Sequence, residues 1–412
     1  MEDLVGRMPG TAAAVLTSLA VLGTSACGGG ADVGRASAGT PGARAAGVPV
    51  GAEATRTPAV ELRAGFTYLL TEHVHLAAAA TGAALASSGQ LTAPALTQAL
   101  SALDANAVAL SGLVGELYPK GKGPFLVAWR QRDGLLVDQA LAAAAHDPRR
   151  GLRARQALEA FDTSFGQLLG SLAPPLPPTT VADDLGLDVS AQLQVTDAQV
   201  AHSPSQFALL RVAAGRMPAT AALLSRGMAR DRGLGDADTA AGDLRAGLTA
   251  LLVSHVYVVA AQVEAAASGA TLRSSATAAT DEVSRGLSRL LGAGYPALAG
   301  PFLSSWRRQV ADLVDYGVAG RRHDLPAQSL ALVRLDEDHT RLGALVHAAV
   351  PQLPAATLAE ELRPQAAALL VALDNADQAS PDAAAALTAA AGHMPSAAEV
   401  LAGGVAEDRS LH

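Results

Sequence analysis

The chain has 412 residues, which exceeds one domain of ordinary size and suffices for two, each able to bury a core of its own. Half of the residues are hydrophobic but only 3% are aromatic, and the abundance of Ala and Leu favours helices over strands. The formal net charge of −8 and the lack of a clustered basic patch exclude the electrostatic footprint of a nucleic-acid-binding protein.

The start of the chain carries the pattern of an export signal. An apolar run from Thr11 to Ala26 is short for a membrane span and ends in small residues, as the cores of signal peptides do. Glu2 and Asp3 depart from the basic leading segment that such signals usually have. We predict a signal peptide at residues 1–26 and an exported protein.

Cys27 follows this run and is the only cysteine, so no disulfide can form within the chain. Placed after small residues and before three glycines, it resembles the lipid-bearing cysteine of bacterial lipoproteins, although Thr24 stands where those proteins usually have Leu. The stretch at 27–57 is rich in Gly, Ala and Pro, which predicts a flexible tether. We therefore predict attachment to the membrane through a lipid anchor on the extracytoplasmic side, with simple secretion as the alternative.

Two parts of the chain repeat each other. Residues 123–147 align with residues 300–324 at an offset of 177, with 12 identities in 25 positions, where composition alone would give only a few. Earlier in the chain, LRAGFTYLLTEHV at Leu62 aligns with LRAGLTALLVSHV at Leu244 at an offset of 182. Self-similarity at a nearly fixed offset over this length predicts an internal duplication.

The repeat also predicts the domains and the fold class. We expect helical module 1 at 58–234 and helical module 2 at 240–412, joined by a Gly- and Asp-rich linker. In the first helix of module 1, Phe66, Leu69 and His73 lie at i, i+3 and i+7, which is one face of a helix. No run shows sustained strand alternation. The prediction is an all-α protein with two tandem repeats of a helical bundle of about six helices each.

His73 and His255 are the first candidates for a functional site. Each places an ionisable ring on an otherwise apolar helix face, at the same position of the two repeats. A buried histidine there needs a hydrogen-bond partner, and a carboxylate or a carbonyl in the core would suffice. The alternatives are a role in binding a ligand or metal, and plain exposure on the surface.

Trp129 and Trp306 are the only tryptophans, and they also occupy matching positions. Each follows a phenylalanine by four residues, a spacing that puts both rings on one helix face and favours core packing. A stacking surface for an organic ligand is the alternative. Asp104 and Asp281 recur in the same way, which suggests the hypothesis that they are the buried partners of the nearby histidines.

The catalytic and metal-binding motifs that a sequence can reveal are missing. The chain has no phosphate-binding loop, no Gly-x-Ser-x-Gly elbow, no His-Glu-x-x-His and no pair of metal-binding cysteines. Glu72 and His75 fit part of a ferritin-like di-iron set, but Ser254 and Tyr257 stand at those places in the second copy. The sequence therefore favours a binding function over a catalytic one, and it identifies no cofactor and no metal.

The order of these features resembles a group of exported bacterial proteins made of tandem helical bundles, some of which are labelled copper amine oxidase-like. The resemblance rests on Leu-Arg, a di-leucine, Glu-His or Ser-His, a Trp-containing helix and an LVD segment, and covers about 60–412. It implies helical bundles and, through the label, copper. Copper amine oxidases make their cofactor from the tyrosine of an Asn-Tyr-Asp/Glu sequence, which this chain lacks.

Two functions are left open by the sequence. The first is a non-catalytic envelope lipoprotein whose bundles bind a small ligand, a metal or another envelope protein. The second is a metal-dependent redox or metal-handling protein that uses His73, His75 and His255. We favour the first, because the standard catalytic motifs are missing.

Overall fold

The computed structural model describes residues 51–412, except for residues 89 and 267–268. The predicted signal peptide, Cys27 and most of the predicted tether lie outside the described residues. Within the described part the chain forms thirteen α-helices and one short 3-10 helix, with no strand. The prediction of an all-α protein is therefore confirmed.

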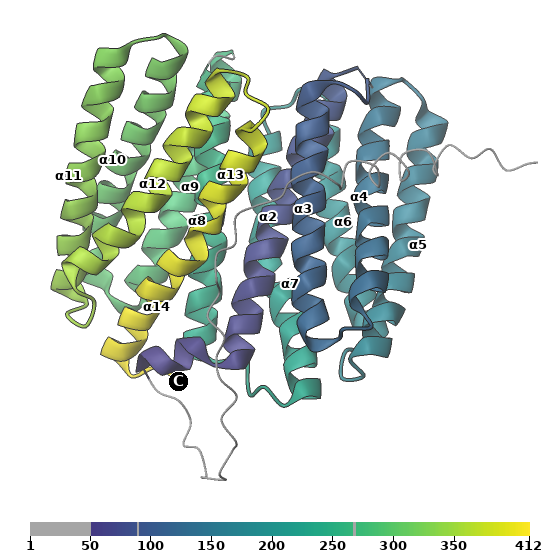
Figure 1. The fold of residues 1–412 in the computed structure, drawn as a ribbon, viewed down its shortest axis with the longest axis horizontal. Coiled ribbons are helices and arrows are strands. Elements are labelled where there is room, and N and C mark those ends of the chain that lie inside the picture. The colour runs from purple at the N-terminus through teal and green to yellow at the C-terminus, as the bar shows by residue number, and fades with distance from the viewer. Residues whose placement is uncertain (1–50, 89, 267–268) are drawn as a thin grey trace, which may run out of the picture. The chain divides into compact units, whose positions relative to one another are not determined.

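Eleven of the α-helices have 23 to 29 residues, while the last two are shorter (Figure 1). In chain order the elements are η1 (Gly51–Arg56), α2 (Pro58–Ala86), α3 (Pro94–Leu117), α4 (Lys122–Ala144), α5 (Pro148–Leu172), α6 (Pro178–Val200), α7 (Gln206–Arg232), α8 (Ala240–Ala266), α9 (Ala270–Gly294), α10 (Pro296–Arg321), α11 (Leu325–Ala349), α12 (Ala355–Asp377), α13 (Ala383–Gly392) and α14 (Met394–Arg409).

The starts of several helices follow local sequence signals. Thr57 caps α2, because its side chain accepts a hydrogen bond from the backbone N–H of Val60. Asp147 caps α5 and Asp324 caps α11 in the same manner. Each of these three helices also carries a proline in its first turn, where the missing N–H is not needed.

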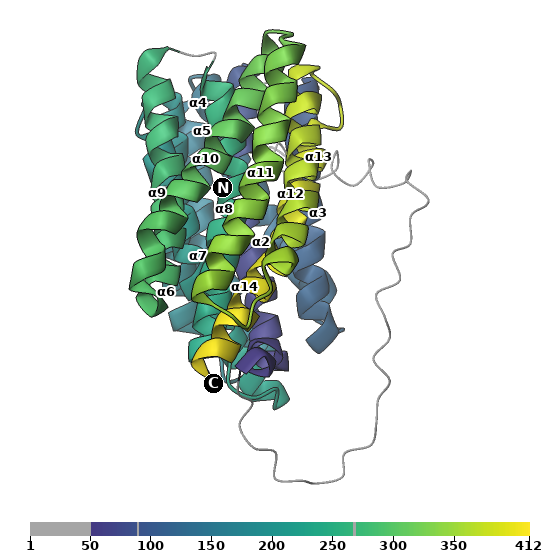
Figure 2. The same cartoon turned by 90° about the vertical axis from the view of Figure 1, so that its left-hand side faces the viewer.

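Helices α2 and α8 lie side by side at the centre, as Figure 1 shows. They run in the same direction, because Glu61 pairs with Arg245 near their starts and Glu72 bonds Tyr257 further along. Helices α3, α4, α6 and α7 pack on α2, while α9, α10, α13 and α14 pack on α8. Figure 2 faces the second half of the chain and shows α9, α10, α11 and α12 as successive neighbours.

Apolar side chains fill the interior in two large clusters. One cluster belongs to the first half and contains Phe66, Phe125 and Trp129. The other centres on the second half and contains Phe302 and Trp306, but it also reaches across to the end of α2 and to α3. The two halves therefore share apolar packing along α2 and α8.

The first described residues belong to the fold, so residues 51–57, which were predicted as part of the tether, are structured. The backbone N–H of Gly51 donates to the carbonyl of Leu411 at 2.8 Å, and η1 packs on α14. Thr55 is buried, and its carbonyl accepts a hydrogen bond from the Arg245 guanidinium. These backbone contacts order a segment whose composition alone suggests flexibility.

By length and composition alone, α3, α7 and α8 are apolar enough to cross a membrane. In the structure, 72% of the most apolar window of α8 is buried inside the protein. A helix surrounded by other helices is expected to be hydrophobic around its whole circumference. The apolar character of α8 is thus explained by its central position.

Candidate functional site

A cleft of about 600 Å³ lies between the two halves, next to the C-terminal ends of α2 and α8. Helices α3, α6 and α7 complete one side, and α9, α10, α12 and α13 contribute to the other. Alanine is the commonest lining residue, and Gly82 adds to the space because it has no side chain. The volume lies within the range that small-molecule binding sites occupy, about 300–1,000 Å³.

Many of the lining positions are paired at the offsets of the sequence repeat. Ala79 is matched by Ala261 at an offset of 182, and Leu210 by Leu387 at an offset of 177. Other pairs differ in chemistry, since Gln199 on α6 corresponds to Ala376 on α12. Matching positions therefore line both sides of the cleft, but their side chains differ in size and polarity, as Phe207 and Ala384 do.

A buried polar cluster lies where the inner end of the cleft meets α2 and α8. Glu72 is 2% exposed, and its Oε1 accepts hydrogen bonds from the hydroxyls of Tyr68 at 3.1 Å and Tyr257 at 3.2 Å. Its Oε2 accepts from the side-chain amide of Asn106 at 2.8 Å. Of these residues, Tyr257 lines the cleft itself.

His75 also lines the cleft and joins the two halves. Its ring stacks on Tyr257 with 4.8 Å between centroids, and its Nε2 lies 3.3 Å from the hydroxyl of Ser254. Burial lowers the pKa of His75 to about 3, so the ring is neutral at pH 7. Burial likewise raises the pKa of Tyr68 and of Tyr257, so both hydroxyls keep their protons.

Burial raises the pKa of Glu72, while its three hydrogen bonds act in the opposite direction by stabilising the carboxylate. All three donors are uncharged side chains. The polar groups near the cleft are thus largely engaged with one another. A guest in the cleft meets alanine surface and neutral polar groups, apart from the ion pair of Arg321 with Glu264.

A smaller groove of about 370 Å³ lies between α3 and α13. It adjoins the cleft, because Gln98, Ala102 and Ala384 line both. Thr97, Ser101 and Thr388 add hydroxyl groups to this groove. Helices α3 and α13 therefore border both hollows.

The structure places His73 in the core of the first half, with a carboxylate as its partner. The ring is 1% exposed, and its Nε2 lies 2.7 Å from Oδ1 of Asp133. The buried Arg132 approaches the same nitrogen at 3.2 Å. Burial lowers the pKa of His73, and Asp133 partly offsets this effect. A ligand-binding role for His73 stays a prediction.

Asp104 and Asp281 are not the partners of the histidines, so that hypothesis is wrong. Asp104 forms a two-pronged contact with Arg130, at 2.6 and 2.9 Å. Asp281 accepts a hydrogen bond from Arg307 at 2.6 Å. Both arginines lie on the next helix, where Arg130 is partly buried and Arg307 is exposed, so these pairs form near the surface, where charges keep their hydration.

Trp129 and Trp306 are packed in the cores of the two halves. They are 2% and 1% exposed, and each stacks on the phenylalanine one turn earlier. His73 lies against Trp129 with 5.1 Å between ring centroids, and His255 lies against Trp306 at 5.0 Å. The structure brings each predicted histidine and tryptophan together, but neither pair lines the cleft.

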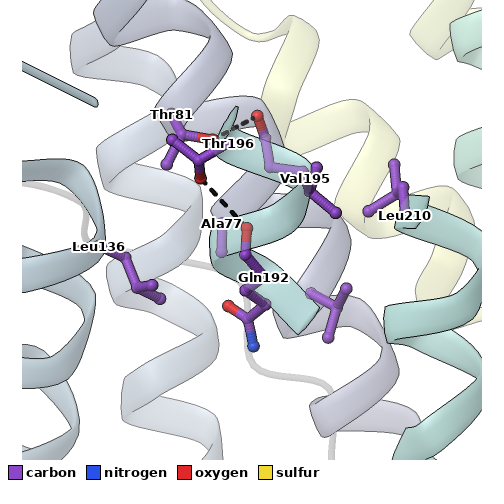
Figure 3. Close-up of a pocket in the computed structure, with 9 residues that line it drawn as sticks. Ala77, Thr81, Leu136, Gln192, Val195, Thr196 and Leu210 are labelled. Atoms are coloured by element: carbon purple, nitrogen blue, oxygen red, sulfur yellow. Dashed lines mark hydrogen bonds between the residues drawn. The ribbon is translucent and has the colours of Figure 1, made fainter. Parts of the chain in front are cut away.

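A small cavity of about 10 Å³ lies in the first half, between α2, α4, α6 and α7 (Figure 3). Gln192 lines it, and neither polar atom of its side-chain amide has a hydrogen-bond partner among the described residues. A volume of this size is close to that of one buried water molecule. The cavity is therefore too small for an organic ligand.

Metal ligands are not gathered in the described part of the chain. No group of three or more His, Cys, Asp and Glu side chains within residues 51–412, outside the three undescribed positions, could hold a metal ion. Glu72 and His75, which fit part of a di-iron set in sequence, bond instead to tyrosine, asparagine and serine side chains. The structure thus assigns these two residues to the contact between α2 and α8.

Comparison with known proteins finds no family model, no curated protein and no solved structure that matches this chain. The interpretation of the cleft therefore rests on its own chemistry.

Sequence reasoning missed the cleft and the polar cluster beside it. The sequence does contain a signal, because Glu72 and His75 are replaced by Ser254 and Tyr257 at the matching positions. In the structure these four residues contact one another crosswise, Glu72 with Tyr257 and His75 with Ser254. The different residues at these matching positions are thus explained by a contact between the two halves.

Proposed function

We propose that this protein is a non-catalytic binding protein of the cell envelope, and that the cleft between its halves takes a small, largely apolar organic molecule. The observation that carries the proposal is a hollow of about 600 Å³ lined mostly by alanine and other apolar side chains. Small-molecule sites are typically concave, apolar and provided with a few polar groups. Here His75 and Tyr257 supply those polar groups.

The charge of the cleft favours an uncharged guest or an uncharged part of a larger one. The neutral imidazole of His75 and the protonated hydroxyl of Tyr257 offer no formal charge at the inner end. Bringing an unpaired charge to such a place is strongly unfavourable. Arg321 and Glu264 near the helix ends are the nearest charged lining groups, so a charged head group fits there.

We also propose that the two halves are tandem repeats. Contacts at matching positions support this, since Tyr118 bonds Asp231 in the first half and Tyr295 bonds Asp408 in the second. The pairs Asp104 with Arg130 and Asp281 with Arg307 are a further example at the same offset of 177.

The contact between α2 and α8 supports an approximate two-fold relation between the repeats. Glu61 pairs with Arg245, and Arg63 pairs with Asp243, which is the same contact with the two halves exchanged. Such reciprocal pairing is expected around a two-fold axis. On this proposal the cleft lies on the axis, which accounts for its paired lining positions.

Export and lipidation are proposals that rest on the sequence around Cys27. If Cys27 carries the lipid, the unmodified chain should incorporate a labelled fatty acid and fractionate with membranes. The Cys27→Ser chain should lose the label and appear in the medium or the soluble fraction. Equal labelling of both chains would contradict lipidation at this residue.

The ligand proposal is tested by extracting the purified full-length protein with organic solvent and identifying released molecules by mass spectrometry. A variant with Ala79→Leu and Ala261→Leu fills the cleft from both central helices, and Ala160→Leu on the exposed face of α5 is the matched control. We expect an apolar compound from the unmodified and control proteins, and its loss from the filled variant. Equal amounts from all three proteins would contradict binding in the cleft.

A further inference from the structure

The core of the second half contains a set of polar side chains without polar partners. Six residues are each at most 2% exposed, and at least one side-chain polar atom of each has no hydrogen-bond partner within the described part of the chain. They are His255, Ser305, Trp306, Gln309, His339 and Gln365. For His255, Gln309 and Gln365, no polar atom of the side chain has a hydrogen-bond partner among the described residues.

These residues come from neighbouring helices. His255 on α8 lies against Trp306 on α10, and Ser305, Trp306 and Gln309 fall within about one turn of that helix. Gln365 lies on α12, which packs on α10. His339 lies on α11 at the contact with α12, where the adjacent Thr340 accepts a hydrogen bond from Arg363.

The matching positions of the first half have different chemistry. Trp129 and His73 correspond to Trp306 and His255, but Arg132 stands at the position of Gln309. There Arg132 contacts His73, which bonds Asp133. At the position of Gln309 the first half thus carries a charged side chain, where the second half carries an uncharged one.

Two aspartates of the first half are likewise matched by uncharged side chains in the second half. Asp162 and Asp188 stand where the second half has His339 and Gln365. Asp188 is buried and accepts hydrogen bonds from Arg216 at 2.9 Å and from Thr220 at 2.9 Å. At these two positions the second half keeps a polar side chain but loses its charge, whereas Asp133 is replaced by the apolar Val310. The buried carboxyl groups that the second half retains on α10 and α11, Asp312 and Asp338, pair with arginines.

Buried polar groups in folded proteins nearly always have a partner, whether protein, ordered water or ligand. A donor or acceptor that is left without one is strongly unfavourable, and these six residues hold nine such atoms. Guests that donate and accept hydrogen bonds would satisfy these atoms. Two carboxamides, two imidazoles, an indole and a hydroxyl offer both kinds of group.

The charges of the six side chains determine whether a charged or an uncharged guest fits. Burial lowers the pKa of both His255 and His339 to about 4, so neither ring carries a charge at neutral pH. The six side chains include no carboxylate and no thiolate to neutralise a cation. An ion among these six side chains would have no group of opposite charge, whereas an uncharged guest needs none.

We propose that the core of the second half is a binding site for uncharged, hydrogen-bonding guests, held among His255, Gln309, His339 and Gln365. The chemistry is shared by ordered water molecules and by a small neutral polar molecule. The site is distinct from the cleft, since none of the six side chains lines it. On this proposal the second half takes an uncharged guest where the first half has the contacts of His73 with Asp133 and Arg132.

A high-resolution crystal structure of the unmodified full chain tests the site directly. We expect electron density within hydrogen-bond distance of the amides of Gln309 and Gln365 and of the ring of His255. Native mass spectrometry then distinguishes the two kinds of guest. An organic molecule adds mass to the folded protein, whereas internal water is seen only as electron density in the crystal. An empty core, or a metal ion found there by elemental analysis, would overturn the proposal.

A near-isosteric substitution provides a second test through stability. If guests satisfy the amide of Gln309, then Gln309→Met removes their partner and should lower the melting temperature by several degrees. If the amide is truly without a partner, the same change removes a desolvation penalty and should raise the melting temperature. The matched control is Gln131→Met at an exposed helical position, which should leave the melting temperature unchanged. A rise in Gln309→Met alone would overturn the proposal.

Discussion

The buried histidines of this protein share apolar surroundings but differ in their partners. His73 has the carboxylate of Asp133, His75 has the hydroxyl of Ser254, and His255 has no hydrogen-bond partner among the described residues. A carboxylate stabilises the protonated ring, whereas a hydroxyl or an apolar wall does not. The same residue type therefore has three different electrostatic roles.

The neutral histidines predict a loss of stability in mild acid. Burial lowers the pKa of His75 to about 3, and of His255 and His339 to about 4, from the usual 6.5. Below pH 6.5 the unfolded chain takes up protons that the folded chain does not, so folding weakens as the pH falls toward 4. Each histidine contributes about 1.4 kcal/mol per pH unit in this window.

Four buried carboxyl groups, those of Glu72, Asp162, Asp188 and Asp312, act against this trend, because burial raises the pKa of each. Burial raises the pKa of Asp162 to about 6 from 3.8, so below pH 6 the folded state holds a proton that the unfolded state lacks. Comparing variants by urea unfolding at pH 7, 6 and 5 isolates the contribution of one histidine from that of the carboxyl groups. The His255→Gln variant should lose less stability than the unmodified chain between pH 7 and pH 5. An equal change in both chains would argue against a neutral, buried His255.

A second prediction at this scale compares two aspartates. Asp133→Ala leaves the buried His73 and Arg132 without their carboxylate, and should lower the free energy of unfolding by about 3–5 kcal/mol. Asp104→Ala breaks a partly exposed pair with Arg130 and should lower it by less than about 1 kcal/mol. Urea midpoints measure both, and equal losses would show that the burial of Asp133 does not matter.

At the residue level the sequence predicted part of the site and missed the rest. Periodicity placed His73 on the buried face of its helix, and the spacing of Phe125 and Trp129 indicated their stacking. The partner of His73 could not be deduced, because Asp133 has no counterpart in the second half, where Val310 stands at that position. The recurrence of Asp104 in both copies suggested this residue as the partner instead, but in both copies the contact is with an arginine.

At the scale of helices, two glycines allow the closest crossings. A side chain at Gly166 on α5 would overlap the carbonyl oxygen of Pro178 on α6. At the matching position of the second half, a side chain at Gly343 on α11 would overlap the carbonyl oxygen of Ala355 on α12. Both helix pairs therefore rely on the absence of a Cβ atom.

This geometry predicts opposite effects for two identical substitutions. Gly343→Ala forces the α11 and α12 backbones apart and should lower the free energy of unfolding by about 1–3 kcal/mol. Gly134→Ala lies in the middle of α4 with open space around it, and should raise it by about 0.5–1 kcal/mol through helix propensity. Circular dichroism during urea unfolding measures both, and stabilisation by Gly343→Ala would contradict the described packing.

Most helices were predictable from apolar period, helix caps and proline positions, but two details were not. Pro218 lies inside the continuous helix α7, whereas Pro395 at the matching position follows a break between α13 and α14. A proline weakens a helix locally, and the surrounding packing decides whether the helix continues. Likewise, η1 owes its order to α14, a contact far away in sequence.

For the molecule as a whole, the contact between α2 and α8 should make the halves interdependent. Arg245 is 4% exposed and depends on Glu61 and Thr55 from the other side of that contact. We expect calorimetry of the chain to show one unfolding transition, because separating the halves exposes buried charged and apolar groups. Two independent transitions would show that the halves are separate folding units.

Binding of a small apolar molecule in the cleft between α2 and α8 can be measured with a fluorescent dye. The delipidated protein is titrated with N-phenyl-1-naphthylamine, an uncharged apolar dye that fluoresces when it leaves water. We expect saturable binding at one site for the unmodified protein and for Ala160→Leu, and its loss when Ala79→Leu and Ala261→Leu fill the cleft. Dye binding that is absent from the unmodified protein, or that persists unchanged in the filled variant, would contradict this expectation.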